Sequence, residues 1–282
     1  PRRTATCDLA DMHLALAPGS DVALFNRLLV EIDKSGAVDV DYLRHVNGFD
    51  ETLRAAMAQE GGVTGLDPAQ VAAFCKMWVG TEKVVTVFRQ GVTQSSSGTD
   101  KVNAILNCHI ATGRIGRPGM GPFSVTGQPN AMGGREVGGL SNALACHLDI
   151  EDAGHRDLVR SFWQAPTMAK GAGLKAVDLF ERVRTRQIKA LWIVCTNPAV
   201  SMPDADVVRD AIAACDFVVV SDVTANTDTA RLAHVLLPAT GWGEKDGTVT
   251  NSDRTISRQR AVLPAPGAAR ADWAIICDVA RR

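Results

Sequence analysis

The chain has 282 residues, enough for one large or two ordinary domains whose core needs no disulfide or structural metal. A hydrophobic content of 46% and a charged content of 22% exclude a disordered tail, a collagen-like rod and a low-complexity linker. The 30 basic and 31 acidic residues nearly cancel, and without a Lys/Arg block or an apolar run of about 18 residues the sequence predicts neither a nucleic-acid partner nor a membrane span.

The seven cysteines are an odd number, spread along the chain without a C-x-x-C pair. This pattern predicts reduced thiols in the cytoplasm and no iron–sulfur or zinc cluster made by these residues. No apolar segment follows Pro1, so no signal peptide is expected. The sequence does not start with Met, which predicts a piece of a longer protein.

Helices dominate the expected structure of the first 111 residues. A turn at residues 18–21 supplies an N-cap for a helix that ends at Gly36, and Asp67 with Pro68 starts another. Valine-rich residues 83–88 predict a strand buried on both faces. Further helices are expected at residues 39–46, 51–59 and 100–111, with a break at Gly61 and Gly62 after the second.

Residues 112–139 are rich in glycine and proline and show neither helical nor strand periodicity, so a long irregular loop with a functional role is expected. Helices are predicted again at residues 138–148, 155–163 and 174–186. Strands at 191–195, 217–220 and 235–237 alternate with a helix at 203–215 and a helical turn at 227–233. This β-α-β-α-β order predicts a parallel unit with ligands at the carboxyl ends of its strands.

The residues that could carry chemistry lie mostly in loops, since no nucleophile elbow, P-loop, G-x-G-x-x-G or H-E-x-x-H occurs. Residues 94–98, 113–134 and 244–248 are either phosphate-binding loops or ordinary turns. Asp21 and Asp222 can each accept two hydrogen bonds from a guanine edge, although Asp21 also fits an ordinary acid at a helix start. Arg135 suits a trigonal oxyanion or a surface ion pair with Glu136.

Four other conspicuous side chains are interpreted as structural. His109 lies on a helical face and is expected in the core. Cys195 ends an apolar strand and is expected to be a packed, inert thiol. Trp192 and Trp242 are expected to pack rather than to stack on a ligand.

Seven segments in order resemble the landmarks of molybdopterin-guanine-dinucleotide (bis-MGD) oxidoreductases, and among them the catalytic subunits of bacterial assimilatory nitrate reductases. Together they span almost the whole chain, which makes the resemblance specific. The segments are PRRTAT at 1–6, PGSD at 18–21, QSSSG at 94–98, ATGRIGRPG at 111–119, GQPNAMGGREV at 127–137, TNP at 196–198 and WGEKDG at 242–247.

The resemblance implies an α/β fold with two Rossmann-like parallel-sheet domains of the DMSO reductase and formate dehydrogenase superfamily, truncated at both ends. Residues 1–130 would be part of one cofactor-binding domain, and residues 131–282 a second with the β-α-β-α-β unit. The implied cofactor is molybdenum bis(molybdopterin guanine dinucleotide). The [4Fe–4S] cluster and the metal-ligating cysteine of the family would lie in a missing N-terminal region, and a cofactor-capping domain in a missing C-terminal one.

The resemblance also implies site residues. Arg135 matches the arginine held near molybdenum, where it would stabilise the substrate anion. Gln90 stands where relatives usually carry Met. The implied contacts to one guanosine and its phosphates are Arg2, Thr4, Gly19 and Asp21, those next to the pterin are Gln90 and Gln94, and those to the second nucleotide are Asn197, Ser221, Asp222, Lys245 and Asp272.

The implied reaction is the two-electron reduction of nitrate to nitrite by oxygen-atom transfer, with an electron-donor protein or reductase subunit as the partner. The fragment alone is expected to be inactive. Two alternatives are a formate dehydrogenase of the same superfamily and a cofactor-free structural relative in an electron-transfer complex. The polar set that includes Arg135, Asp21, Asn197 and Asp222 argues against a scaffold.

Overall fold

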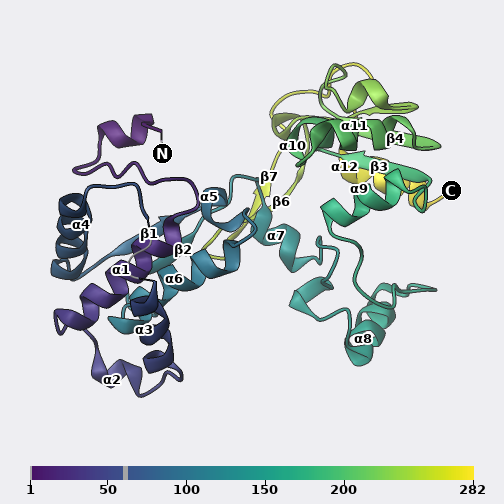
Figure 1. The fold of residues 1–282 in the computed structure, drawn as a ribbon. Coiled ribbons are helices and arrows are strands. Elements are labelled where there is room, and N and C mark those ends of the chain that lie inside the picture. Colours follow the sequence, from purple (N-terminus) through teal and green to yellow (C-terminus); the bar gives the residue numbers. More distant parts are fainter. Residues whose placement is uncertain (1, 60–62) are drawn as a thin grey trace. The chain divides into compact units, whose positions relative to one another are not determined.

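The computed structural model describes residues 2–59 and 63–282, so the break expected at Gly61 and Gly62 lies outside the described residues. The chain divides into two compact units, Pro1–Gly127 and Gln128–Arg282. Both are mixtures of helices and short parallel strands (Figure 1). A separate cofactor-binding role for each of the two predicted domains remains a prediction.

The first unit is mainly helical, and its core lies around α1 and α6. The buried side chains of this core include Leu28, Ile32, Trp78 and Cys108. Its elements are η1 (Ala5–Asp8), α1 (Asp21–Lys34), α2 (Val40–Leu43), α3 (Phe49–Ala58), α4 (Pro68–Gly80), β1 (Val85–Phe88), α5 (Gln90–Thr93), α6 (Gly98–Ala111) and β2 (Gly121–Ser124).

The predicted helix starts in this unit are confirmed. Helix α1 begins directly after the turn at Ser20, and its apolar residues at helical spacing are buried, which accounts for its position in the core. At α4 the Asp67 carboxylate accepts a 2.7 Å hydrogen bond from the N–H of Ala69, and Pro68 occupies the first helical position.

The strand of the first unit differs from its prediction. Strand β1 pairs in parallel with β2, with Val85 opposite Gly121 and Phe88 opposite Ser124. Only Phe88 of β1 is buried, while Val85 and Val87 are about half exposed. The valine-rich sequence was therefore correct for a strand and wrong for burial on both faces, because the sheet formed by the described residues has only two strands.

The second unit contains the predicted β-α-β-α-β segment. Strands β3, β4 and β5 form a parallel sheet in that order, with Leu191 opposite Val218 and Val220 opposite Leu236. The elements are α7 (Ala131–Glu136), η2 (Ala145–His147), α8 (Ala153–Trp163), α9 (Ala176–Arg184), β3 (Ala190–Val194), α10 (Pro198–Ser201), α11 (Ala205–Ala213), β4 (Phe217–Asp222), η3 (Ala230–Leu232), β5 (Val235–Pro238), η4 (Trp242–Glu244), β6 (Gly247–Thr250), β7 (Ile256–Gln259) and α12 (Asp272–Ala280).

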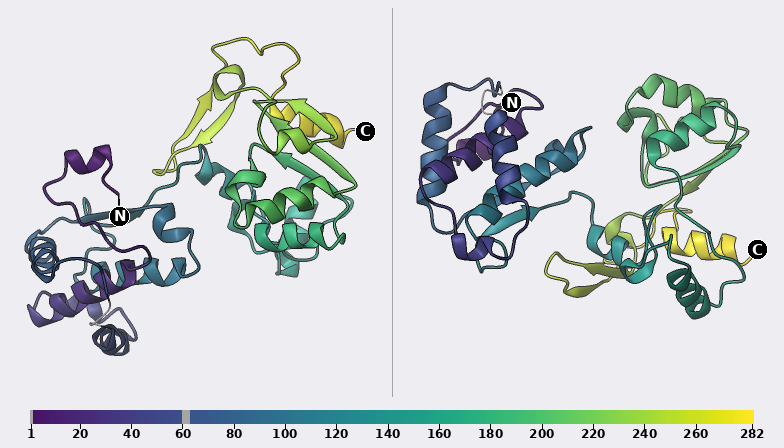
Figure 2. Two further views of the ribbon diagram at one scale, coloured as in Figure 1. Left: turned by 45° about the horizontal axis from the view of Figure 1, so that its top comes forward. Right: turned by 60° about the horizontal axis from the view of Figure 1, so that its bottom comes forward.

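The core of the second unit lies between this sheet and two helices. Leu191 and Val218 of the sheet form one buried cluster with Val183 of α9 and Ile212 of α11. The alternation of buried and exposed residues along β3 follows from the period of two in a strand. An antiparallel hairpin of β6 and β7, which was not expected from the sequence, projects from the same unit (Figure 2).

Two predictions between residues 112 and 148 were wrong. Residues 112–139 are not one irregular loop, since they include β2 and the short helix α7. The helix expected at 138–148 is replaced by turns and η2, because Gly138 has φ of +77° and Cys146 and His147 have φ near +60°, outside the right-handed helical region.

His109 is in the core, as predicted. Its Nε2 lies 2.7 Å from Oγ1 of Thr86, its ring meets Trp78 edge-on with centroids 5.3 Å apart, and the side chain is fully buried. Burial, helped by the positive charge of Arg114, lowers the pKa of His109 from 6.5 to about 4.

This buried imidazole predicts a loss of stability in acid. Between pH 6.5 and 4 the unfolded chain protonates His109 and the folded chain does not, so the free energy of unfolding falls as the pH falls. Urea unfolding at pH 7 and 4.5 should show that wild type loses about 2–3 kcal/mol more than His109→Gln, whose amide can keep the bond to Thr86. Parallel losses in the two proteins would contradict this account.

Candidate functional site

A cavity of about 350 Å³ in the first unit lies beside the start of α1. Its volume is in the range of small-molecule sites. The wall combines the turn before α1 with the beginning of α5, so two segments about 70 residues apart in sequence meet there. The lining residues are Leu14, Leu16, Ala17, Pro18, Gly19, Asp21, Arg89, Gly91 and Val92.

Gly19 and Asp21, both predicted to be site residues, lie in this wall. Gly19 has φ of +85°, a conformation that glycine adopts without strain and that turns the chain into α1. Asp21 is the first residue of α1, and its Oδ2 lies 2.9 Å from Nζ of Lys101 on α6. The lysine side chain is only 5% exposed and that of Asp21 is 22% exposed, so the ion pair leaves one side of the carboxylate accessible.

The other predicted residues of this unit are less closely grouped. Gln90 is the first residue of α5, between cavity residues Arg89 and Gly91, and the exposed Gln94 follows the helix. Arg2 and Thr4 are exposed at η1 and do not line the cavity. The N–H and hydroxyl of Thr4 contact Sγ of Cys7 and lower the pKa of that thiol.

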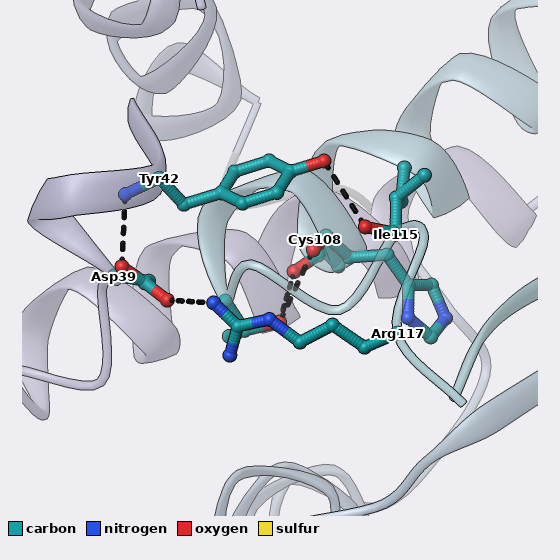
Figure 3. A network of polar contacts seen from close by, with 7 residues as sticks. Asp39, Tyr42, Cys108, Ile115 and Arg117 are labelled. Carbon is teal, nitrogen blue, oxygen red and sulfur yellow. Dashed lines mark hydrogen bonds and ion pairs between the residues drawn. The ribbon is translucent and has the colours of Figure 1, made fainter. Parts of the chain in front are cut away.

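The glycine-rich residues after α6 are held by a polar network (Figure 3). The Asp39 carboxylate accepts 2.9 Å hydrogen bonds from the N–H of Tyr42 and from Nη2 of Arg117, which keep the pKa of Asp39 below its ordinary value. The Tyr42 hydroxyl donates to the carbonyl of Ile115 at 3.3 Å. Arg117 is therefore used to anchor this loop to α2.

Arg114 is also engaged within the protein. Its guanidinium lies 4.0 Å from the centre of the Trp78 ring, and Nη2 donates to the carbonyls of Trp78 and Thr81 at the end of α4. A cation at a helix C-terminus is favoured by the helix dipole. The segment 113–119 thus uses both of its arginines to stabilise the first unit.

In the second unit, four predicted residues lie on the loops and helix start that follow the strands of the parallel sheet. Asn197 comes after β3 and Asp222 ends β4, while Lys245 and Asp272 come later in the chain. The Lys245 ammonium lies 3.0 Å from Oδ2 of Asp272, the first residue of α12. The charges of Asp272, Lys245 and Asp222 all act on Cys195, which shows that these groups are neighbours.

Cys195 differs from its prediction because it is exposed rather than packed, with φ of +57° at the end of β3. Partial burial of its sulfur and then the negative charge of Asp272 raise the pKa of the thiol, while Lys245 opposes them. Trp242, three residues before Lys245, was also expected to pack, but it is 77% exposed. Trp192 is about one-third exposed and donates to the Ser221 hydroxyl at 2.9 Å.

Asn197 and Ser221 are both used to hold the sheet. Oδ1 of Asn197 accepts hydrogen bonds from the N–H and the hydroxyl of Thr229, at 3.1 and 2.7 Å. Ser221 is 1% exposed, with its hydroxyl bonded to Trp192. Asn197 could present its amide nitrogen to a ligand. The carbonyl of Ser221 accepts a hydrogen bond from the N–H of Cys195, so the hydroxyl and the carbonyl of this buried residue are both used within the sheet.

Two buried oxygens near the carboxyl edge have no hydrogen-bond partner among the described residues. They are Oδ1 of Asp272 and Oγ1 of Thr240, which follows β5. A buried polar atom without a partner is costly, so such atoms indicate a missing donor. A purine edge with N–H groups would supply donors to the carboxylate, and the residues present therefore fit a guanine nucleotide.

Arg135 lies on α7, which the hairpin holds at both ends. The Asn130 side chain accepts a 2.8 Å hydrogen bond from the N–H of Thr250, and Glu136 pairs with Arg254 at 2.9 Å. Glu136 is therefore engaged elsewhere, which removes the alternative of an ion pair with Arg135. Arg135 itself is exposed, and its guanidinium has no hydrogen-bond or ion-pair partner in the described part of the chain. The guanidinium is thus available to an anion.

Lys101 was not predicted from the sequence, although its helical position indicated it. It precedes Ile105 by four residues and Ala104 by three, which places it on the buried face of α6. A lysine on an apolar helical face requires a partner. The partner, Asp21, is distant in sequence, so only the structure identifies it.

The whole chain, residues 1–282, matches the model of the molybdopterin oxidoreductase family. The chain belongs to this family. It is 51% identical to a nitrate reductase of Klebsiella oxytoca, over 99% of the chain and 32% of that protein. It is 35% identical to the assimilatory nitrate reductase catalytic subunit of Bacillus subtilis, over 99% of the chain and 40% of that protein.

A third relative has another activity in its name. The F420-dependent formate dehydrogenase 2 subunit alpha of Methanococcus maripaludis is 32% identical over 100% of the chain and 42% of that protein. The chain thus spans about a third to two-fifths of the length of the relatives described here.

The described residues show neither a metal-binding cluster nor a membrane-spanning helix. Residues 2–59 and 63–282 contain no group of three or more His, Cys, Asp or Glu side chains placed to hold a metal ion. Within the same residues, every helix is too short or too polar to cross a bilayer.

The contact between Gly113 and Asp39 predicts a specific effect of substitution. A Cβ on Gly113 would clash with Oδ2 of Asp39, whereas one on Gly116 would meet no atom within 4 Å. Both glycines have positive φ, so the backbone strain of an alanine, about 1–2 kcal/mol, is common to both. Gly113→Ala should therefore lower the free energy of unfolding by clearly more than Gly116→Ala in urea titrations. Equal losses would show that Asp39 does not restrict this position.

Proposed function

We propose that the chain is the nucleotide-binding part of a nitrate reductase that carries molybdenum bis(molybdopterin guanine dinucleotide). The observation that carries this proposal is the pair of lysine-held carboxylates, Asp21 in the first unit and Asp272 in the second. Family membership and the identity to nitrate reductases support it. On this proposal each unit contributes one Rossmann-like cofactor-binding domain, with the boundary near residue 130.

The first nucleotide would be held by the cavity beside α1. The Asp21 carboxylate would accept hydrogen bonds from guanine, and the turn at Gly19 would let the backbone approach the ligand. Arg2 and Thr4 would contact the phosphates, and Gln90 and Gln94 would approach the pterin.

The second nucleotide would be held by the loops after β3, β4 and β5. Asp272 and Asp222 would accept from the base, and Lys245 would keep Asp272 in place. Asn197 would present its amide nitrogen, since its oxygen is bonded to Thr229. Ser221 would support the site from within the sheet, because its hydroxyl is bonded to Trp192 and its carbonyl accepts from the N–H of Cys195.

Arg135 would bind the substrate anion. Its planar guanidinium can donate two parallel hydrogen bonds to a trigonal oxyanion such as nitrate, and α7 is fixed by the hairpin, so the side chain is presented from a rigid base. The bound metal centre would supply the two-electron redox chemistry that converts nitrate to nitrite. Arg135 would stabilise the negative charge that shifts between the oxygens in that reaction.

Other parts of the proposed protein lie outside these residues. An iron–sulfur cluster would need ligands that the described residues do not group together. We propose a [4Fe–4S] cluster elsewhere in the full-length protein, an electron-donor protein or reductase subunit as its partner, and a cytoplasmic location with a role in nitrate assimilation.

The experiment that tests the proposal uses the full-length protein that contains this chain. It should contain molybdenum and should reduce nitrate with an artificial one-electron donor. A protein with molybdenum that oxidises formate and leaves nitrate unchanged would show the alternative, a formate dehydrogenase, for which the relative in Methanococcus maripaludis is the supporting observation. A folded protein without molybdenum would contradict both and favour a structural subunit.

Arg135 gives a sharper prediction in the same protein. Arg135→Ala should lower kcat/KM for nitrate by about tenfold to a hundredfold, since a charge-assisted contact contributes about 1.5–3 kcal/mol. The molybdenum content should stay near wild type.

Arg209→Ala is the matched control, because Arg209 is a half-exposed residue of α11 in a surface pair with Asp206. This variant should leave nitrate kinetics unchanged. Unchanged kinetics in Arg135→Ala would remove Arg135 from the substrate site.

A further inference from the structure

Lys101 is a buried cation, and its acidic partner among the described residues is Asp21. Its side chain is 5% exposed on α6, and its ammonium is 2.9 Å from Oδ2 of Asp21. Lysine is seldom buried to this degree unless it is paired. In the described residues Oδ1 of Asp21 has no hydrogen-bond partner, and Asp21 lines the cavity beside α1. One carboxylate oxygen, Oδ2, is therefore fixed by the buried lysine, and the other, Oδ1, is accessible from the cavity.

The same arrangement occurs in the second unit. Lys245 lies 3.0 Å from Oδ2 of Asp272, and Oδ1 of that carboxylate is buried without a partner. Asp21 and Asp272 are each the first residue of a helix, α1 and α12. Both units thus pair one oxygen of a helix-start carboxylate with a lysine. Asp21 lines a cavity, whereas the second oxygen of Asp272 is buried without a partner in the described residues.

We propose that Lys101 is a positioning residue that gives the cavity of the first unit its preference for guanine. This inference rests on the proposed function, in which Asp21 binds the base. A free aspartate side chain rotates among several rotamers, and ordering it at binding costs free energy. Lys101 holds the carboxylate in one orientation before the ligand arrives, so its open oxygen meets the donor groups of the base.

The chemistry of the base makes the proposal testable. Guanine carries an N1–H and a 2-amino group on one edge, and hypoxanthine differs only by lacking the 2-amino group. A carboxylate in the correct orientation gains a charge-assisted hydrogen bond from that amino group. A carboxylate that can rotate gains less from it, so the preference for GMP over IMP reports on the orientation of Asp21.

The test uses the full-length protein produced in a host that makes no molybdenum cofactor, with GMP and IMP as the probes in calorimetric titrations. Wild type should bind GMP at two sites, one for each unit. Lys101→Met, which keeps the length of the side chain and removes its charge, should reduce the GMP-over-IMP preference about tenfold at one site and leave the other unchanged. Lys101→Arg should restore most of the preference.

A matched control and a double variant complete the design. Lys76→Met changes an exposed lysine of α4 in the same unit and should bind as wild type does. Asp21→Asn should also lose the preference at that site. Adding Lys101→Met to Asp21→Asn should change it no further, because the lysine acts through the carboxylate.

The possible outcomes distinguish an error in the proposed function from an error in the role of Lys101. If wild type binds neither nucleotide, the proposed function is wrong. If wild type prefers GMP and Lys101→Met keeps the full preference, the role of Lys101 is wrong and the proposed function stands. Equal losses of GMP and IMP affinity in Lys101→Met, or additive losses in the double variant, would show a purely structural lysine and would also overturn the inference.

Discussion

The ion pair between a lysine and an aspartate at the first turn of a helix is the interaction on which the account depends. Among the described residues it occurs twice, as Lys101 with Asp21 and as Lys245 with Asp272. In both cases the ammonium contacts Oδ2. Asp21 lines the cavity beside α1, whereas Oδ1 of Asp272 is buried without a hydrogen-bond partner. An acid at a helix N-terminus is already favoured by the helix dipole, and the lysine adds a defined orientation. Such a carboxylate is suited to recognise a ligand with N–H donors.

The other charged loops mostly stabilise the protein through internal contacts. The segment that contains Arg114 and Arg117 has the composition of a phosphate-binding loop, yet both arginines are used inside the first unit, against Trp78 and Asp39. Arg135 is different, since its neighbours Asn130 and Glu136 are bonded to the hairpin and its own guanidinium is left exposed. Among the arginines of the glycine-rich region 113–135, Arg135 is the one whose guanidinium is exposed and has no hydrogen-bond or ion-pair partner in the described residues.

Local signals in the sequence predicted the elements whose formation depends on neighbouring residues. The start of α1, the cap of α4 and the alternation of strands and helices from β3 to β5 are of this kind. Ser20 makes no side-chain capping bond to α1. The prediction that β1 is buried on both faces was wrong, because burial depends on how many strands lie beside it. The hairpin of β6 and β7 was missed because its strands carry few apolar residues. For the site, the segment PGSD at 18–21 pointed to Asp21 and the family resemblance implied Asp272, whereas Lys101 required the fold, since 80 positions separate it from its partner.

On the proposed function, one polypeptide binds both guanine nucleotides of a single molybdenum cofactor. The most direct test of this claim is to release the nucleotides from the purified full-length protein by acid hydrolysis and to count GMP and molybdenum per chain. Two molecules of GMP for each molybdenum atom are expected. Molybdenum without GMP, or a protein that reduces nitrate with no nucleotide bound, would contradict the account.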